Sequence, residues 1–224
     1  MLAAAGDTPV HRIYHGLNAE LASRVHETAD LVSGSRHAIR MLGVGRLVHK
    51  KGFDVFIAAC GLLAARGVPF TAVLVGEDGE HGPALRDAVT RAGLEDHVVF
   101  AGPMTQAQLF QEYQRASVFC LPCRVVDNGD RDGIPNVLME AMVCGVPVVT
   151  TAISGIPELV RDGDNGLFVP VGDAASLADA VLRIHQDPAL ATRLSQAGRQ
   201  TIERDFDGDR LAGHLASLFH EVTA

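Results

Sequence analysis

The stretch MLGVGRLVHKKGF, residues 41–53, joins a short apolar run to the start of a helical pattern. Its first part is apolar and ends at Gly45, as a buried strand does where it enters a tight turn. Apolar side chains then recur with the period of a helix over residues 53–65. A strand, a glycine turn and a helix in this order form the repeating unit of a parallel sheet that is covered by helices on both faces.

The same alternation of apolar runs and helical patterns continues to the end of the chain. The sequence predicts strands at residues 41–45, 70–76, 97–101, 117–121, 146–150 and 166–169. It predicts helices at residues 53–65, 83–92, 106–115, 136–144, 174–186, 189–204 and 210–222. Because crossovers between parallel strands are right-handed, we expect an α/β fold, a doubly wound, Rossmann-like parallel sheet of about six strands. Ligands of such sheets bind in the loops that follow the carboxyl ends of the strands.

The composition is that of a globular protein. Of the 224 residues, 47% are hydrophobic and 21% are charged, which excludes wholesale disorder. The formal net charge of -8 argues against nucleic acid as the main partner, because nucleic-acid phosphates attract basic surfaces. No apolar run approaches the roughly 18 residues of a membrane span, and residues 1–10 lack the pattern of a signal peptide. The four cysteines do not make a disulfide framework in a chain of this length, so we expect a cytoplasmic protein.

The first loop, after residue 44, has the features of an anion site. Gly45 allows a tight turn and Gly52 precedes a helix, whose free N–H groups and dipole favour a negative charge. Arg46 offers a guanidinium fork for phosphate oxygens, and Lys51 adds a point charge. The alternative is a solvated basic turn. A dinucleotide-binding fingerprint is disfavoured, because it needs glycine where Val48 stands.

The second loop begins at Asp132 with the stretch DGIPNVLME. Pro135 suits the first turn of a helix, since that position has no use for an N–H group. The N–H groups of Asn136 and Val137 are then free to face an anion, and Glu140 could accept hydrogen bonds from the hydroxyls of a ribose. The alternative is an ordinary helix start at which the dipole favours acidic side chains.

Taken together, the motifs resemble glycosyltransferase family 4, and most of all its bacterial exopolysaccharide (colanic-acid-type) members. The resemblance runs from about residue 10 to the C-terminus and keeps the order and spacing of the motifs. The stretches that carry it are residues 45–47, 51–53, 73–76, 119–122, 132–149, 154–158 and 164–167.

The resemblance implies the GT-B architecture, in which two Rossmann-like domains face each other across a cleft. The C-terminal domain of such proteins binds the nucleotide-sugar donor, and the N-terminal domain supplies most of the acceptor site. We accordingly expect residues 1–38 to be a remnant of the N-terminal domain and its hinge. Residues 10–14 could form a strand, and residues 10–18 resemble the last strand of that domain and the hinge after it. Residues 39–205 would be the nucleotide-sugar-binding domain, and residues 206–224 a C-terminal crossover helix.

Three catalytic residues follow from the resemblance. Arg46 and Lys51 would grip the diphosphate and stabilise the departing nucleoside diphosphate. Asp132 occupies the first position of the paired-glutamate motif of the family, near the donor sugar and phosphate. Two residues here depart from the family pattern. Asp132 is one methylene shorter than glutamate, and Pro135 replaces a frequent glycine.

The resemblance also implies donor-binding residues. Glu140 would hold the ribose, the backbone of Gly133 and Ile134 would meet sugar hydroxyls, and the loop at 102–104 would pack the nucleobase. The expected donor-binding residues are Gly45, Gly133, Ile134, Asn136, Val137, Glu140 and Met104.

The expected function is the donor half of a retaining hexosyltransferase of surface-polysaccharide biosynthesis. It would transfer a hexosyl group from a nucleotide-diphosphate sugar to a saccharide or lipid-linked saccharide, without a metal or other cofactor. We expect a cytoplasmic location. The full-length enzyme would associate peripherally with the inner face of the membrane. Two alternatives remain: a donor-binding subunit or fragment that needs a separate acceptor-domain partner, and a nicotinamide-dependent oxidoreductase, which Val48 disfavours.

The last predicted helix, residues 210–222, has an apolar stripe. This stripe predicts either a homodimer or partner chain on that face, or packing against residues 10–36. The Cys120-Leu121-Pro122-Cys123 spacing lies at the end of an apolar strand, where no helix start stabilises a thiolate, so we expect it to be structural rather than redox-active.

Overall fold

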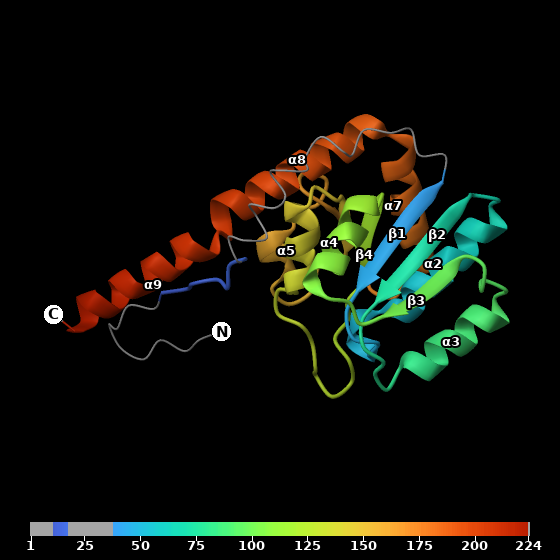
Figure 1. Ribbon diagram of the computed structural model, residues 1–224, viewed down its shortest axis with the longest axis horizontal. Coiled ribbons are helices and arrows are strands. Elements are labelled where there is room, and N and C mark those ends of the chain that lie inside the picture. The colour runs from blue at the N-terminus through green and yellow to red at the C-terminus, as the bar shows by residue number, and fades with distance from the viewer. Residues whose placement is uncertain (1–10, 18–37, 224) are drawn as a thin grey trace.

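The computed structural model describes residues 11–17 and 38–223. Its centre is a parallel six-stranded sheet with the strand order β3-β2-β1-β4-β5-β6 (Figure 1). The strands are β1 (Ile39–Val44), β2 (Phe70–Val75), β3 (Val98–Gly102), β4 (Val118–Leu121), β5 (Val148–Thr150) and β6 (Leu167–Phe168). The predicted doubly wound, Rossmann-like sheet is thus confirmed, and its strand order reverses between β1 and β4.

Helices cover both faces of the sheet. They are α2 (Phe53–Ala65), α3 (Gly82–Arg91), α4 (Gln106–Arg115), α5 (Asn136–Val143), α6 (Ile156–Leu159), α7 (Ala174–Gln186), α8 (Pro188–Asp205) and α9 (Gly208–Thr223). Helix α2 packs against α3 and α7 on one face, whereas α4 and α5 cover the other and α8 packs on α5 (Figure 1). The carboxyl ends of the strands therefore share one edge, where the loops after β1 and β4 are neighbours.

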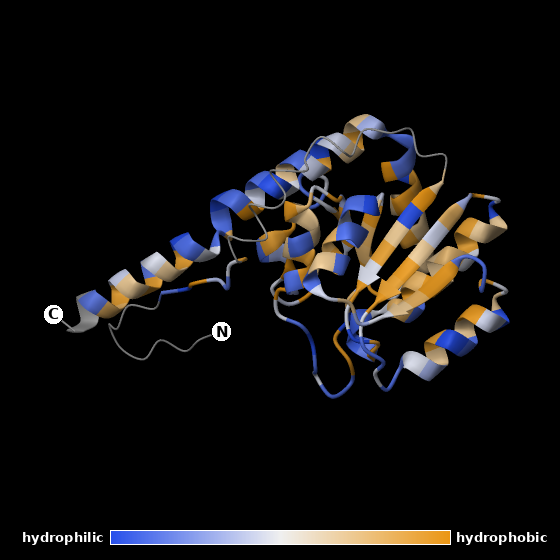
Figure 2. Cartoon of the chain, in the orientation of Figure 1, coloured by the Kyte–Doolittle hydropathy of each residue, from blue (hydrophilic) through white to orange (hydrophobic). Residues whose placement is uncertain are grey.

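The strands form because their residues are apolar almost throughout. β1 and β2 pair in register from Ile39 with Phe70 to Val44 with Val75, and nearly all of their side chains are buried. Figure 2 shows these strands as a hydrophobic band at the centre of the molecule. Burial on both faces is what a parallel sheet between two helical layers requires.

Short elements depart most from the sequence prediction. A single 3-10 turn, η2 (His49–Lys51), precedes α2, and the four-residue helix α6 follows β5. Neither is long enough to show a helical period in the sequence. Strand β6 is limited to Leu167–Phe168, and α3 begins one residue earlier than expected, at Gly82.

Residues 11–17 do not form the strand that the sequence suggested at 10–14. Their backbone is irregular, and only Leu17 makes an isolated bridge, to Asp207. The Leu17 N–H donates to the carbonyl of Phe206 at 2.9 Å, and the Gly208 N–H donates to the carbonyl of Leu17 at 3.0 Å. The segment is therefore tied to the junction of α8 and α9 instead of pairing with the sheet. The rest of the expected N-terminal remnant lies outside the described residues.

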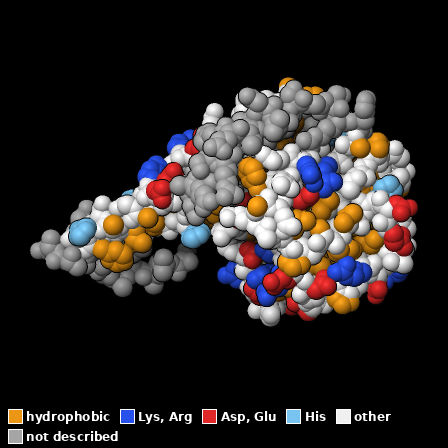
Figure 3. All heavy atoms as spheres, viewed as in Figure 1, with side chains coloured by type: hydrophobic (Ala, Val, Ile, Leu, Met, Phe, Trp, Pro, Cys, Tyr) orange, Lys and Arg blue, Asp and Glu red, His pale blue; other side chains and the backbone are white. Residues whose placement is uncertain are grey.

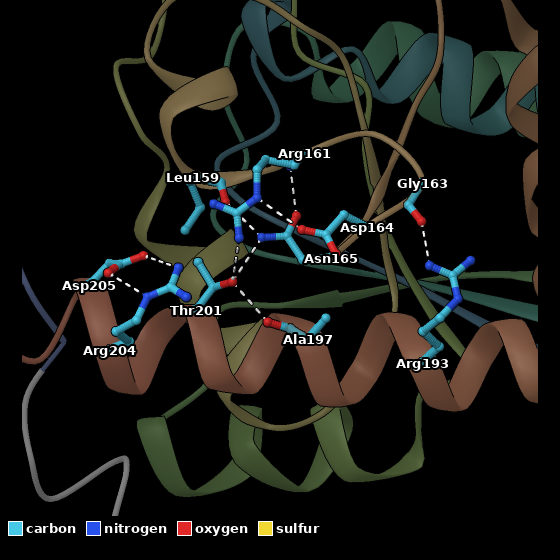
Figure 4. Close-up of polar contacts among 10 residues, drawn as sticks. All are labelled: Leu159, Arg161, Gly163, Asp164, Asn165, Arg193, Ala197, Thr201, Arg204 and Asp205. Atoms are coloured by element: carbon cyan, nitrogen blue, oxygen red, sulfur yellow. Dashed lines mark hydrogen bonds and ion pairs between the residues drawn. The ribbon is translucent and has the colours of Figure 1, made fainter.

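A buried amide holds α8 to the loop before β6 (Figure 4). Asn165 is buried, and its side-chain nitrogen donates to the carbonyl of Leu159 and to Thr201 Oγ1, both at 3.0 Å. Its side-chain oxygen accepts from the N–H of Arg161 at 2.6 Å. Both donors of the amide are used and its oxygen has a partner, as the burial of a polar group requires.

Helix α9 extends away from the body of the domain (Figure 1). Its side chains Leu215 and Phe219 are 41% and 64% exposed, and Figure 3 shows an apolar patch on this helix. The apolar stripe predicted at residues 210–222 is thus present at the surface. Of residues 10–36, one of its two expected partners, the structure describes only 11–17, and there Leu17 bonds to Phe206 and to Gly208 at the start of α9.

Candidate functional site

The loops after β1 and β4 meet at the carboxyl edge of the sheet. The Arg124 N–H donates to the carbonyl of Lys50 at 2.9 Å, which joins the two loops through their backbones. Gly52 stands between them with a φ of 70°, and a Cβ at this position would lie 1.9 Å from the carbonyl oxygen of Pro122. Only glycine allows this approach. The residues that sequence analysis assigned to two separate motifs therefore share one edge.

The glycine turn at the end of β1 is covered by a lysine side chain. Gly76, at the end of β2, has a φ of 148°, and a Cβ there would lie 2.1 Å from the carbonyl oxygen of Gly45. A Cβ at Gly45 would lie 3.1 Å from Cε of Lys51, so the lysine chain runs directly over this turn. The close packing fixes where the Lys51 ammonium group can reach.

An ion-pair cluster joins the two loops. Lys51 Nζ lies 2.8 Å from Asp132 Oδ2, and the two side chains are only 14% and 17% exposed. Lys50 Nζ lies 3.6 Å from Asp132 Oδ1 and 3.0 Å from Asp130 Oδ1. The sequence suggested Lys51 as a cation available to phosphate. The structure instead pairs it with Asp132, so an anion must compete with this carboxylate for the ammonium group.

Arg46 is the exposed cation of the same turn. It follows Gly45 directly, and within the described part of the chain its guanidinium group makes no ion pair. Its planar fork is therefore available to an anion in solution, whereas Lys51 is engaged.

Helix α5 begins without a side-chain cap. Its N-cap is Pro135, with extended backbone angles of φ -66° and ψ 124°, and the helix starts at Asn136. The sequence placed Pro135 inside the first turn, but the proline stands just before it, where its carbonyl accepts from the N–H of Leu138 at 3.0 Å. The N–H groups of Asn136 and Val137 precede the first intrahelical bond, so they remain available to an anion.

Glu140 lies on α5 and is held by a residue that sequence analysis missed. Tyr113 of α4 donates from its hydroxyl to Glu140 Oε2 at 2.9 Å, and its hydroxyl lies 3.4 Å from the carbonyl oxygen of Val137. Burial raises the pKa of Glu140, whereas the hydrogen bond from Tyr113 lowers it. In the sequence, Tyr113 looks like an ordinary core residue of a helix. The available signal was that a buried tyrosine hydroxyl needs a hydrogen-bond partner.

The remaining donor-site candidates lie along the same edge. Ile134 packs near Gly155, which caps the start of α6. A Cβ on Gly155 would lie 2.9 Å from Cγ1 of Ile134. Gly133 is exposed, with open space where a Cβ would stand. Met104 follows β3 and is half-buried against the core. The edge thus collects Gly45, Arg46, Lys51, Asp132 and the start of α5, while Met104 lies beyond β2 in the strand order.

A pair of histidines, not anticipated from the sequence, lies beside this edge. The rings of His49 and His81 stack with their centroids 3.7 Å apart. His81 is buried, and its Nδ1 has no hydrogen-bond partner among the described residues. Burial lowers the pKa of His81, and the neighbouring His49 lowers it further. The stack anchors η2, and with it the lysines of the ion-pair cluster, against the start of α3.

The cysteines behave as core residues. Cys120 and Cys123 are free and buried, and burial raises the pKa of the Cys123 thiol to about 12. A thiol in that state is not a nucleophile at neutral pH. Among the described residues, no three or more His, Cys, Asp or Glu side chains are grouped so that they could hold a metal ion. No helix in the described ranges combines the length and the apolar character that crossing a membrane requires.

A cavity of about 1000 Å³ lies at the opposite, amino edge of the sheet. Ile39 at the start of β1, Val118 at the start of β4 and Arg199 on α8 contribute to its walls. It is therefore remote from the loops that carry the ion-pair cluster, although Tyr113, whose hydroxyl donates to Glu140, is also one of its lining residues.

Comparison with known families assigns the chain. The family model described as glycosyl transferases group 1 matches residues 38–187. The chain belongs to this family. The match covers all the strands and the loops that carry the ion-pair cluster, so the resemblance noted from the sequence motifs is confirmed.

Two curated relatives of this family member are glycosyltransferases named for amylovoran and colanic acid biosynthesis, in line with the resemblance noted from the sequence motifs. The amylovoran biosynthesis glycosyltransferase AmsK of Erwinia amylovora is 38% identical over 184 residues, which is 82% of this chain and 45% of the relative. The colanic acid biosynthesis glycosyltransferase WcaL of Escherichia coli K12 is 37% identical over 185 residues, with the same coverage of 82% and 45%. The chain thus spans less than half of the length of these curated relatives.

Solved structures share the fold. Anabaena Alr3699/HepE in complex with UDP-glucose is 25% identical, with a TM-score of 0.74 over 92% of this chain and 57% of that chain. The C-terminal domain of the glycosyl transferase group 1 family protein LpcC from Francisella tularensis has a TM-score of 0.64 at 22% identity. That match covers 87% of this chain and 96% of the solved domain, so the two folds are of similar extent.

Proposed function

We propose that this chain is the donor-binding half of a retaining glycosyltransferase. It would bind a nucleotide-diphosphate sugar and serve the transfer of its hexosyl group to a saccharide or lipid-linked saccharide in surface-polysaccharide biosynthesis. The observation that carries the proposal is the convergence of Arg46, Lys51 and the uncapped start of α5 on one edge of the sheet. Cations and free backbone N–H groups in one place suit a diphosphate.

The relatives support this assignment. Two of them are named for amylovoran and colanic acid biosynthesis, and a structural neighbour was solved with UDP-glucose. The division into domains follows the same reasoning. Residues 39–205 would bind the donor, 206–224 would form the crossover helix, and 1–38 would be what remains of the acceptor domain and hinge. The proposed location is the cytoplasm, at the inner face of the membrane.

The proposed chemistry is stabilisation of the leaving group. As the bond from the sugar to the diphosphate breaks, negative charge develops on the departing oxygen. Arg46 and Lys51 would neutralise it, and the N–H groups of Asn136 and Val137 would bind the distal phosphate. Lys51 must then exchange Asp132 for a phosphate oxygen, which leaves the Asp132 carboxylate close to the donor sugar. In this proposal no metal ion is needed, because the chain supplies the positive charge.

The remaining donor contacts in this proposal are those that the family resemblance implies. The carboxylate of Glu140 would accept hydrogen bonds from the ribose hydroxyls. Gly133 and Ile134 would offer backbone groups to the sugar, and Met104 would pack near the nucleobase. A transfer reaction also needs an acceptor site, so we propose donor binding as the activity that this chain carries, with an acceptor-domain partner completing transfer.

Calorimetry with nucleoside diphosphates tests this proposal. A thermal-shift screen of UDP, GDP, ADP and their sugars should first identify the donor, because a ligand that binds the native state raises the melting temperature. Arg46→Ala should then weaken nucleoside-diphosphate binding by roughly 1.5–3 kcal/mol, the range for a hydrogen bond to a charged group. Arg183→Ala, at the exposed end of α7, is the matched control and should leave the affinity unchanged.

Two results would overturn the proposal. If none of the nucleotides raises the melting temperature of the wild-type chain, the donor site is wrong. If Arg46→Ala binds as tightly as the wild type, Arg46 has no role in binding the diphosphate. A titration with NADH serves as the counter-test, and saturable NADH binding would favour the oxidoreductase alternative.

A further inference from the structure

The strongest unassigned feature is the buried contact between α4 and α5. The Tyr113 side chain is 1% exposed, and its ring lies against Phe119 with the centroids 5.9 Å apart. Packing of this kind restricts an aromatic side chain to a single orientation. Its hydroxyl is thereby held at a fixed point against Glu140, which is only half-buried and stands one turn into α5 from the uncapped start of that helix.

The hydroxyl of Tyr113 has one proton and two acceptors within reach. Glu140 Oε2 is 2.9 Å away and the carbonyl oxygen of Val137 is 3.4 Å away, so the shorter contact marks the carboxylate as the acceptor. A hydrogen bond to one carboxylate oxygen fixes the rotation of the whole group. Oε1, and the free lone pair of Oε2, then have a defined direction.

We propose that Tyr113 is a positioning residue that aims the Glu140 carboxylate at the vicinal hydroxyls of a ribose and so selects ribonucleotides over 2′-deoxyribonucleotides. The inference rests on the proposed function, in which Glu140 meets the ribose. Two vicinal hydroxyls are two donors at a fixed separation, and a carboxylate held in one orientation can accept from both. A freely rotating carboxylate would lose conformational entropy on binding them.

Tyr113 also affects the pKa of the Glu140 carboxyl group. Burial raises the pKa of Glu140, and the hydrogen bond from Tyr113 opposes that shift. Another titratable group that interacts with this carboxylate is the Cys144 thiol, whose pKa burial raises to about 12, so it stays uncharged. Without the tyrosine hydroxyl, Glu140 is easier to protonate. A protonated carboxyl group donates from one oxygen, so it no longer accepts from both ribose hydroxyls.

The test compares ribonucleotides with 2′-deoxyribonucleotides in calorimetry. The probes are UDP and GDP with 2′-deoxy-UDP and 2′-deoxy-GDP, titrated into the full chain. Tyr113→Phe should weaken binding of the ribonucleotide about tenfold, since it removes one hydrogen bond to a charged group, and should leave the deoxynucleotide within about twofold. The preference of the wild type for ribose should shrink accordingly. Acidification should weaken ribonucleotide binding at a higher pH in the variant than in the wild type, because the pKa of Glu140 rises further.

The matched control is Tyr14→Phe. The chain has two tyrosines, and the Tyr14 hydroxyl also donates to a glutamate, Glu158 Oε2, at 2.6 Å. This variant removes the same chemical group from a different part of the fold and should leave the ribose preference unchanged. A loss of ribose preference in both variants would trace the effect to stability and overturn the proposal.

A second measurement does not depend on the folding of the Tyr113 variant. Both tyrosines can be replaced biosynthetically by 3-fluorotyrosine, and Tyr14→Phe assigns the two ¹⁹F resonances. UDP or GDP should shift the Tyr113 resonance more than the 2′-deoxy forms do. Equal shifts, or equal weakening of both nucleotide classes by Tyr113→Phe, would overturn the positioning role while the proposed function stands. If the wild type binds none of the nucleotides, the proposed function fails and the role of Tyr113 fails with it.

Discussion

Gly52 is the residue on which the meeting of the two loops depends. Its φ of 70° belongs to the left-handed region, and the place of a Cβ is taken by the carbonyl oxygen of Pro122, 1.9 Å away. Any side chain would push the loop after β4 away from η2. The distance between Lys51 and Asp132 would then change, because each belongs to one of these loops.

We predict that Gly52→Ala destabilises the fold by about 3 kcal/mol or more, since it combines left-handed strain with a backbone clash. Gly67→Ala is the matched control, because Gly67 has a φ of 67° and nothing within 4 Å of its Cβ position. It should cost about 1 kcal/mol from the backbone alone. Urea unfolding measures both, and equal losses would mean that contact with Pro122 is unimportant.

Single residues could be singled out as candidates where they belong to a motif. Arg46 and Lys51 stand out as cations beside the glycines of the turn after a strand, and Asp132 and Glu140 as two acids that flank a loop and the start of a helix. Tyr113 did not stand out, since a buried tyrosine of an amphipathic helix looks like any core residue until its hydroxyl partner is known. The pairing of Lys51 with Asp132 was also out of reach, because it depends on two loops that only the folded sheet brings together.

At the level of elements, the ion-pair cluster links η2 to the loop before α5. Asp132 neutralises Lys51 at 2.8 Å, and both side chains are largely buried. A diphosphate that approaches Lys51 meets the negative charge of Asp132 as well. The Asp132 carboxylate therefore competes with the anion that the site is proposed to bind, because both would pair with the Lys51 ammonium group.

We predict that Asp132→Asn tightens binding of a free nucleoside diphosphate about fivefold, because it removes a competing negative charge worth about 1 kcal/mol. Binding of the complete nucleotide sugar should gain less, since Asp132 would also contact the sugar. Asp130→Asn is the control, because Asp130 is 55% exposed and pairs with Lys50 rather than Lys51. Calorimetry decides the question, and weaker diphosphate binding by Asp132→Asn would mean that the carboxylate holds Lys51 in place for the ligand.

Long elements were predicted well and short ones were not. Continuous apolar runs identified the strands, because a parallel sheet between two helical layers buries both faces. The turn η2 and helix α6 are set by contacts with neighbouring loops, such as the backbone bond from Arg124 to Lys50. Residues 10–14 suggested a strand, but the part of this segment that the structure describes has no strand, and Tyr14 lies against Phe206 at the end of α8 with ring centroids 5.0 Å apart.

On the scale of the whole molecule, α9 leaves an apolar surface in contact with solvent. Leu215 is 41% exposed on the helix that extends from the body (Figure 3). Apolar surface of this kind favours association, because burying it removes it from water.

We predict concentration-dependent self-association through α9, measured by sedimentation velocity. Leu215→Asp should shift the protein towards the monomer without lowering its melting temperature, because the side chain contributes little to the core. Ser217→Asp adds the same charge on the opposite side of the helix and should leave association unchanged. A wild-type chain that stays monomeric at all concentrations would contradict the prediction.

The bridge between Leu17 and the end of α8 joins two points that are far apart in the sequence, through the bonds of Leu17 with Phe206 and Gly208. Gly16 packs so closely here that a Cβ would lie 2.5 Å from Cα of Gly208. The chain thus reaches the domain and departs along α9 at a common point. Residues 11–17 would share one pivot with α9, and a rotation there would swing both together relative to the sheet.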